Sequence, residues 1–444
     1  MLCRQFIRTA LGSKVRLRPF HSSSTLLAKK PAKAGKSTGG KGKKGKNTEK
    51  KLLLGRPSNN LKGGIVGLAN VGKSSIFQAI SKSHLGNPAN YPFATIDPEE
   101  ARVIVPSDRF DKLCDVYKPE NAVPATLTLF DIAGLVKGAS KGEGLGNAFL
   151  ANIRAVDGLF QVVRAFDDPE ITHIEGSIDP TRDLEIVTHE LLEKDIEFVL
   201  RALETAERSV KAAASQKNSM VLTERKFEQS VCGKILEHLE SGKKVYHGDW
   251  TNDEIRFINT LTLLTAKPTA YIANVSFADY KAFITGGKKL DNIKYLSSIR
   301  RWIDENSPGD LLVPVCVEYE VRLFESSEAG EELDTASTVP SAIGPAISSL
   351  RKALNLISFF TGSPREVREW TIRQGSTAPE AAGVIHGDLE KTFIVAQVTK
   401  FDDVISHKGD EASLKSGGKI ANKGKDYEME DADCVIFKAA NGKK

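Results

Sequence analysis

The sequence predicts an α/β protein whose main domain is a doubly wound sheet with a phosphate-binding loop. A helical hairpin interrupts this domain, and a small α+β module follows it. Three observations support the prediction: short apolar segments alternate with helical ones, a glycine-rich loop follows the first apolar segment, and two long charged segments have helical periodicity. With 444 residues, the chain is long enough for two or three domains.

Six short apolar segments of the main domain have the length and composition of buried strands. They are Lys62–Gly67, Ala101–Val105, Ala125–Phe130, Gly158–Arg164, Pro268–Asn274 and Asp310–Cys316. The segment from Ser74 to Ser83 has the pattern of a helix directly after the first of these strands. Strands that alternate with helices in this way form a largely parallel sheet with helices on both faces.

Two segments between the fourth and fifth strands have a different composition, with apolar residues at helical spacing among dense charges. We predict that Asp183 to Ala214 and Glu224 to Leu239 form two antiparallel helices of a coiled-coil hairpin. The alternative is a pair of surface helices that lie flat on the core. Either arrangement makes the region of about 183–250 an insertion into the main domain.

The composition changes again after Leu354. The segments 357–360, 367–372, 393–398 and 434–437 are typical of strands, and we expect one helix among them, from Ala378 to His386. This pattern predicts a separate α+β module over residues 356–440.

The positive charge of the chain is concentrated at its N-terminal end. Residues 1–50 carry 14 of the 62 Lys and Arg residues and one of the 57 Asp and Glu residues, so the rest of the chain is acidic overall. The first 30 residues lack acids, are rich in Arg and Ser, and have apolar side chains at helical spacing. This composition is typical of a mitochondrial presequence, followed by a flexible basic linker. The alternative is a disordered basic arm that contacts RNA.

The remaining composition excludes several classes of protein. No apolar run approaches the ~20 residues that a membrane-spanning helix needs, so we expect no membrane insertion. The five cysteines are far apart and include no Cys-x-x-Cys pair. We therefore expect reduced thiols rather than a disulfide framework or a cysteine metal site.

The strongest motif is the loop between the first strand and the first helix, Gly67-Leu-Ala-Asn-Val-Gly-Lys-Ser74, which has the form G-x-x-x-x-G-K-[ST]. Such a loop curls backbone N–H groups around the phosphates of a nucleoside triphosphate at a helix N-terminus. We expect the lysine to bridge the β- and γ-phosphates and the serine to bind Mg²⁺. The predicted nucleotide-binding residues of the loop are Asn70, Val71, Gly72, Lys73, Ser74 and Ser75.

Two later segments complete the predicted site. Asp131-Ile-Ala-Gly134 stands at the end of an apolar strand, where the carboxylate can reach Mg²⁺ and the glycine N–H can meet the γ-phosphate. Thr95 lies between this motif and the loop, and we expect it to close on the metal when triphosphate is bound. The glycine-rich stretch 137–146 predicts a mobile segment that responds to the γ-phosphate.

Two positions distinguish this site from that of a Ras-like GTPase. Such enzymes place a glutamine after D-x-x-G to orient the attacking water, and here the residue is Leu135. Guanine readers carry Asn-Lys-x-Asp after a strand, and the corresponding segment here is Asn274-Val-Ser-Phe277. We expect that hydrolysis is slow, helped by a partner in trans or served by another side chain. By elimination, we expect adenine rather than guanine. Asn274 and Val275 are the predicted residues of the base site.

Several motifs together resemble the signatures of the YchF/Obg-like ATPase family, in its fungal mitochondrial branch. They are the segments 67–75, 90–98 and 131–146, with 375–386 and 424–427 resembling its TGS domain. The resemblance extends from about Lys62 to Phe437. It implies a Ras-like P-loop NTPase domain over 61–355 with a hairpin insertion, and a TGS (β-grasp) domain over 356–440.

The resemblance also implies a function. Members prefer ATP, use Mg²⁺ and associate with the ribosome, and they carry a hydrophobic residue where Ras-like enzymes have the catalytic glutamine, as Leu135 does here. Lys73, Gly134 and Gln161 are then the predicted catalytic residues, and Ser74, Thr95 and Asp131 the metal ligands.

Three positions depart from the pattern of the family. Phe277 replaces its base-site acid, Cys316-Val317 replaces a pair of small residues, and Gln161 stands where members often carry histidine. A glutamine can orient a water molecule but cannot act as a general base near neutral pH.

We therefore expect a monomeric, slow ATPase switch of the mitochondrial matrix that acts on the ribosome or its RNA. Two alternatives stay open, a GTPase of the Obg type and a nucleotide-sensing module with negligible hydrolysis.

Overall fold

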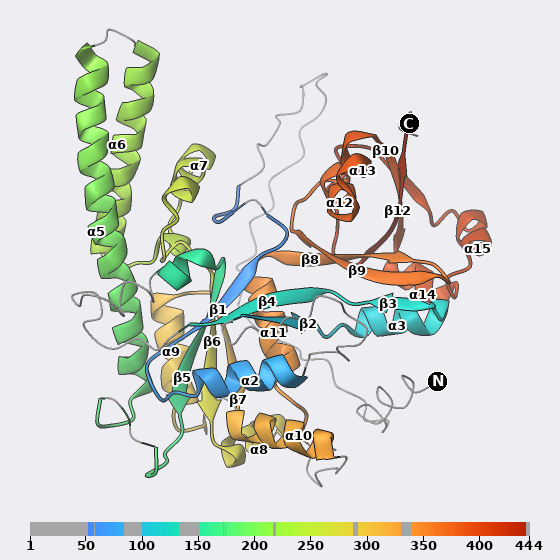
Figure 1. Ribbon diagram of the computed structural model, residues 1–444, viewed down its shortest axis with the longest axis horizontal. Helices are drawn as coiled ribbons and strands as arrows, with labels where there is room; N and C mark the ends of the chain where they lie inside the picture. Colours follow the sequence, from blue (N-terminus) through green and yellow to red (C-terminus); the bar gives the residue numbers. More distant parts are fainter. Residues whose placement is uncertain are drawn as a thin grey trace, which may run out of the picture. The chain divides into compact units, whose positions relative to one another are not determined.

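The computed structural model describes residues 52–56, 58–83, 100–132, 151–171, 173, 175–215, 219–286, 292–329 and 339–440 (Figure 1). The presequence and linker predicted for residues 1–50 lie outside this part of the chain. Within it, no helix is long and apolar enough to span a bilayer. Its four cysteines, Cys114, Cys232, Cys316 and Cys434, form no disulfide.

The first of two six-stranded sheets is the predicted doubly wound sheet. Its strands are β1 (Lys62–Val66), β2 (Glu100–Ile104), β4 (Thr126–Asp131), β5 (Gly158–Ala165), β6 (Thr269–Val275) and β7 (Leu311–Val315). They follow the order β2-β4-β1-β5-β6-β7. All neighbouring pairs are parallel except β2 and β4, which are antiparallel. The six predicted strands are therefore all present, within one or two residues of the expected bounds.

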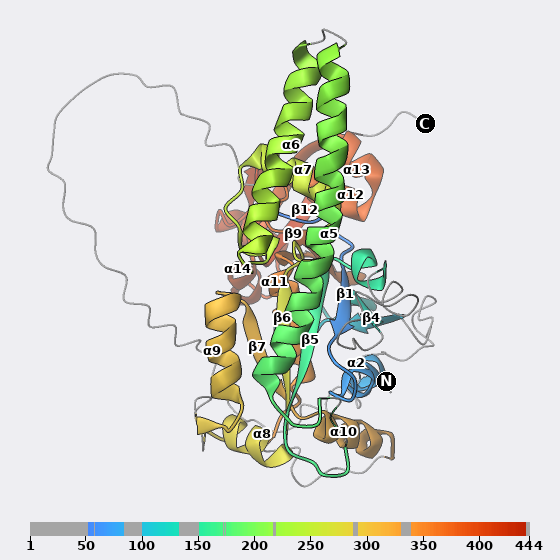
Figure 2. The same ribbon diagram turned by 90° about the vertical axis from the view of Figure 1, so that its left-hand side faces the viewer.

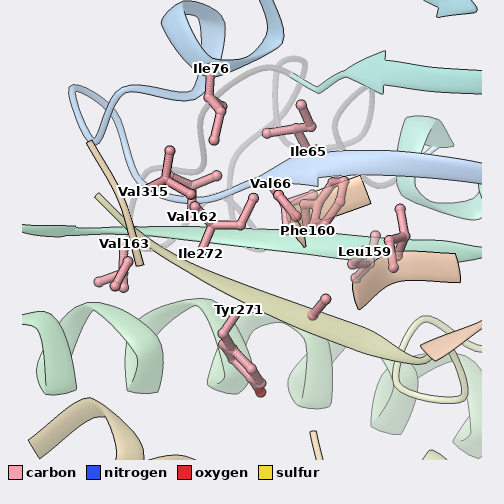
Figure 3. Packing of buried hydrophobic residues seen from close by; sticks show 14 of the residues in the cluster. Ile65, Val66, Ile76, Leu159, Phe160, Val162, Val163, Tyr271, Ile272 and Val315 are labelled. Carbon is pink, nitrogen blue, oxygen red and sulfur yellow. The ribbon is translucent and has the colours of Figure 1, made fainter. Parts of the chain in front are cut away.

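Helices cover both faces of this sheet. One face carries α2 (Lys73–Ser83), α10 (Val317–Ala329) and α11 (Ile343–Ala353), and the other carries α5 (Pro180–Ser215) and α9 (Leu296–Asn306) (Figures 1 and 2). Ile76 lies above the sheet and Tyr271 below it, within one continuous core (Figure 3). The main domain also contains η3 (Val245–His247), α7 (Asn252–Leu261) and α8 (Phe277–Ile284).

The predicted hairpin consists of α5 and α6 (Ser219–Glu240), which pack along each other. The first half of α5 covers the sheet, and only Ala206 and Ala213 are buried in its second half, beyond residue 200. The buried carboxylate of Asp195 fixes the base of the hairpin, because it accepts hydrogen bonds from the backbone N–H groups of Leu264 and Thr265 at 3.0 and 2.7 Å. The hairpin is thus anchored at its base and pairs with itself further out.

The second sheet belongs mainly to the C-terminal module. It contains β8 (Leu356–Gly362), β9 (Glu366–Arg373), β10 (Phe393–Lys400), β11 (Ala421–Lys423) and β12 (Asp433–Ala439), in the order β11-β10-β12-β8-β9-β3. The last strand, β3 (Asn121–Val123), comes from the main domain, directly after α3 (Asp108–Tyr117). The module is therefore completed by a strand that lies more than 230 residues earlier in the chain.

The expectation of one helix in this module was wrong. The structure has the expected helix as α12 (Ala378–Ile385), and three others, α13 (Gly387–Lys391), α14 (Phe401–Ser406) and α15 (Glu411–Ser416). These three helices have only five or six residues each. Helices this short owe their stability to tertiary packing, so the periodicity of the sequence does not reveal them.

Candidate nucleotide site

The phosphate-binding loop leaves β1 at Gly67 and enters α2 at Lys73, and two of its glycines are required by close contacts. Gly67 has φ +154°, and a Cβ there would lie 2.4 Å from the backbone oxygen of Val162. Gly72 has φ +97°, and a Cβ there would lie 2.6 Å from Nδ2 of Asn274. A larger residue at either position would displace the loop from the sheet.

Lys73 begins α2, and its side chain curls back into the loop. Its Nζ donates a hydrogen bond to the backbone oxygen of Leu68 at 2.6 Å, and the residue is 7% exposed. Burial lowers the pKa of the Lys73 ammonium, and the nearby charge of Asp131 partly offsets this. A partly desolvated cation held inside a curl of backbone is suited to a polyphosphate.

Ser74 and Asp131 bring two oxygen donors together at the end of the loop. Asp131 ends β4, in parallel register with Ile65 of β1, and its carboxylate accepts a hydrogen bond from the Ser74 hydroxyl. Burial raises the pKa of the Asp131 carboxyl, and Ser74 and Lys73 partly offset the effect. Its Oδ1 is buried and has no hydrogen-bond partner among the described residues. A hydroxyl beside an unsatisfied carboxylate oxygen fits the all-oxygen coordination that Mg²⁺ prefers.

Asn274 lies against the loop. Its Nδ2 donates to the backbone oxygen of Val71 at 3.1 Å, and its Oδ1 accepts from the backbone N–H of Val317 at 3.2 Å. The side chain is 5% exposed. These contacts hold the loop against the start of α10, and the predicted contact of Asn274 with the nucleotide stays a prediction.

The other predicted residue of this strand end, Val275, is 2% exposed and belongs to the core. Beyond it, Ser276 caps α8 and accepts a hydrogen bond from the backbone N–H of Asp279. Phe277, which stands where a guanine reader has its aspartate, packs against Tyr319 of α10 with ring centroids 4.8 Å apart. The end of β6 therefore presents an aromatic pair in place of an acidic side chain.

Gln161 lies in β5, opposite Val66 of β1 in the parallel register. Figure 3 shows Val163 on the side of the sheet that α5 covers. Side chains alternate along a strand, so Gln161 faces the same side. It is 2% exposed, and its Nε2 has no hydrogen-bond partner among the described residues. A buried amide donor without a partner among the described residues is unusual.

Sequence reasoning missed Arg164, which lies opposite Asn274 in the register of β5 and β6. This arginine is 0% exposed, and its guanidinium donates to three backbone oxygens of the following loop, those of Phe166, Asp168 and Ile171, at 2.9 to 3.2 Å. It fixes the loop that leaves the nucleotide edge of the sheet. An arginine near the end of a largely apolar strand was the available signal.

Two predicted residues, Thr95 and Gly134, lie outside the described part of the chain, as does Leu135. Asn70 and Ser75 are exposed in the loop and in the first turn of α2, and Asn70 has φ +62°. The structure thus brings together the loop, Ser74 and Asp131 at the carboxyl edge of the sheet. This edge is where open α/β sheets bind their ligands.

Comparisons with known proteins agree with this geometry. Residues 62–202 match a family model described as a 50S ribosome-binding GTPase, and residues 356–440 match the YchF-GTPase C-terminal model, described as a protein of unknown function (DUF933). "Obg-like ATPase 1" of Saccharomyces cerevisiae is 56% identical over 398 residues, covering 89% of this chain and 98% of that protein. The chain belongs to the YchF/Obg-like ATPase family.

Further relatives place this YchF/Obg-like protein beside other fungal members. An "Obg-like ATPase homolog" of Saccharomyces cerevisiae is 48% identical over 406 residues, covering 88% of this chain and 98% of that one. The solved structure of the Schizosaccharomyces pombe YchF GTPase is 51% identical, with a TM-score of 0.76, and covers 87% of this chain and all of that one. The predicted fold class is therefore confirmed. The names of these relatives include both ATPase and GTPase, so they do not decide whether this protein prefers ATP or GTP.

Proposed function

We propose that this protein hydrolyses ATP slowly at the Gly67–Ser74 loop and uses the nucleotide as a conformational switch on the mitochondrial ribosome. The observation that carries the proposal is that Lys73, Ser74 and Asp131, with its unsatisfied Oδ1, lie close together at the end of the loop. When bound there, Mg²⁺ would neutralise phosphate charge between Ser74 and Asp131.

The preference for ATP is supported by the base site. A guanine reader needs a carboxylate that accepts hydrogen bonds from the base, and Phe277 supplies none. Its ring packs on Tyr319, and the polar atoms of Asn274 are engaged with the backbone of Val71 and Val317. The position of the guanine-specific acid is thus apolar, which favours adenine by removing the interaction that selects guanine.

Slow hydrolysis is supported by the two residues that the sequence offers for positioning the attacking water. Leu135 cannot hydrogen-bond a water molecule. Gln161 can, but its side chain is 2% exposed in the interior of the sheet. An enzyme that lacks a positioned water-orienting residue depends on a partner to complete its site.

The proposed location and partner rest on the sequence at the N-terminus and on the relatives. The first 50 residues have the basic, acid-poor composition of a presequence and linker. One matching family model is described as a 50S ribosome-binding GTPase, and we extend ribosome binding to this chain as part of the proposal. We also propose that the protein acts in the mitochondrial matrix as a monomer; the N-terminal composition supports the location.

Two other functions have an observation in their favour. The similar Schizosaccharomyces pombe protein of known structure is named a GTPase, which favours GTP. Leu135 and the burial of Gln161 favour a nucleotide-sensing module with negligible hydrolysis.

Turnover of ATP with and without purified mitochondrial ribosomes tests the proposed switch. Without ribosomes we expect turnover on the order of 10⁻³ s⁻¹, and with them a rise of about tenfold or more, as for switches completed by a partner. A Lys73→Ala variant gives the background of the assay. Rates that stay at this background in both conditions would leave only the nucleotide-sensing module.

A further inference from the structure

The β2–β4 pair connects the candidate metal site to the C-terminal module. The two strands are antiparallel, with Glu100 opposite Phe130 at one end and Ile104 opposite Thr126 at the other. The first end leads directly to Asp131, which bonds Ser74. The second end leads to the residues that dock on the C-terminal module.

Residues 105–125, which connect β2 to β4, form a short and stiff segment outside the main sheet, the docking excursion. Between the remote ends of β2 and β4 lie only α3, β3 and brief connections that contain Pro106 and Pro124. The backbone hydrogen bonding between β2 and β4 continues one residue past the strand ends, where the N–H of Val105 donates to the backbone oxygen of Ala125 at 2.9 Å. Proline fixes φ on both connections, so the excursion has little freedom to move independently of β2 and β4.

The excursion is built into the C-terminal module by backbone pairing. β3 extends its sheet by parallel pairing with β9, with Asn121 opposite Glu366 and Val123 opposite Arg368. The N–H of Asn121 also donates to the oxygen of Arg365 at 3.0 Å. A displacement of β3 along its axis would therefore carry β9 with it or break these bonds.

Side-chain packing adds to this attachment. Leu113 of α3 is 1% exposed and shares a buried cluster with side chains of the C-terminal module. The cluster members from that module are Phe360, Val367, Val404, Leu414 and Ala432. The ring of Tyr117 lies so close to Gly362 and Gly409 that a Cβ at either position would lie 2.6 or 2.8 Å from it.

We propose that the C-terminal module senses the nucleotide state of the loop through the β2–β4 pair and its docking excursion. This rests on the proposed function, since it requires Mg²⁺ and triphosphate to bind beside Asp131. Binding that engages Asp131 restrains the end of β4, and the stiff pair passes the restraint to β3 and β9. By reciprocity, loosening α3 on the module must change the affinity for ATP.

Hydrogen exchange of the full chain, measured by mass spectrometry with and without Mg·ATP, tests the coupling. We expect exchange to slow about threefold or more in β3 and in residues 366–368 of β9, and to stay unchanged in α6. A parallel titration measures ATP binding in the same sample. If ATP binds while exchange slows only around the loop, the coupling is absent and the proposed function stands. If no ATP binds, both proposals fail.

A matched pair of variants tests the reciprocal effect. Leu113→Ala removes a buried leucine between α3 and the C-terminal module, and we expect the affinity for ATP to change about fivefold or more. Leu239→Ala removes an equally buried leucine in α6, at 1% exposure, and should leave the affinity unchanged. Equal effects of the two substitutions would contradict the coupling. If Leu113→Ala does not fold, the hydrogen-exchange experiment on the unmodified chain alone decides whether the coupling exists.

Discussion

Replacing Lys73 by alanine is expected to abolish ATP hydrolysis and to weaken ATP binding about 10- to 100-fold, the loss of a charge-assisted hydrogen bond to phosphate. In the structure, Nζ of Lys73 is held on the oxygen of Leu68 inside the loop. It therefore lies where the curl of backbone N–H groups would place the β- and γ-phosphates. No other described lysine lies within the loop.

The same substitution should not destabilise the fold. Burial lowers the pKa of the Lys73 ammonium, which means that the charged form is penalised where it stands. Removing it relieves this penalty, so the melting temperature without nucleotide should stay the same or rise. Titration calorimetry and thermal melts check the two halves of the prediction, with Lys281→Ala on the exposed surface of α8 as the control. Normal ATP affinity in Lys73→Ala would show that the loop is not the binding site.

Replacing Asp131 by asparagine is expected to remove the Mg²⁺-dependent part of ATP affinity. Asparagine keeps the size of the side chain and still accepts the hydrogen bond of Ser74, but it lacks the charge that a divalent cation requires. We expect binding in Mg²⁺ to fall about tenfold or more, the cost of one charge-assisted interaction, and binding in EDTA to stay unchanged. Asp304→Asn, at an exposed site on α9, is the control.

The pH dependence of the unmodified protein should report on the same carboxylate. Burial raises the pKa of the Asp131 carboxyl above its ordinary value. Protons therefore compete with the metal at a higher pH than for an exposed aspartate, and the Mg²⁺-dependent affinity should fall on acidification. Asp131→Asn should lose this pH dependence together with the metal effect. If Asp131→Asn keeps both the Mg²⁺-dependent affinity and its pH dependence, the metal binds elsewhere.

Much of the site could be predicted because its chemistry needs few residue types at fixed spacing. Gly67 and Gly72 are required by positive φ and close contacts, and Asp131 ends an apolar strand. The apolar strands were visible because both of their faces are buried, as in β5 and β6, where every residue is buried. These features are local, so a single sequence contains them.

The parts that sequence reasoning missed depend on distant contacts. The strand β3 has three residues, two of them exposed, and exists through pairing with β9, which follows more than 240 residues later. Sequence reasoning also did not foresee the contacts that Asn274 makes with the backbone. Its two bonds to the backbone of Val71 and Val317 join segments that are far apart in the chain. No local pattern indicates such a link.

The central claim is that the Gly67–Ser74 loop binds a triphosphate with Mg²⁺ and that the base site prefers ATP. Its most direct test is a competition titration, in which ATP and GTP displace a fluorescent nucleotide from the full chain in the presence of Mg²⁺. We expect ATP to compete about tenfold more strongly than GTP, a difference of about 1.4 kcal/mol. GTP that binds tenfold more tightly than ATP would contradict the claim, because Phe277 would then stand in a guanine-selective site.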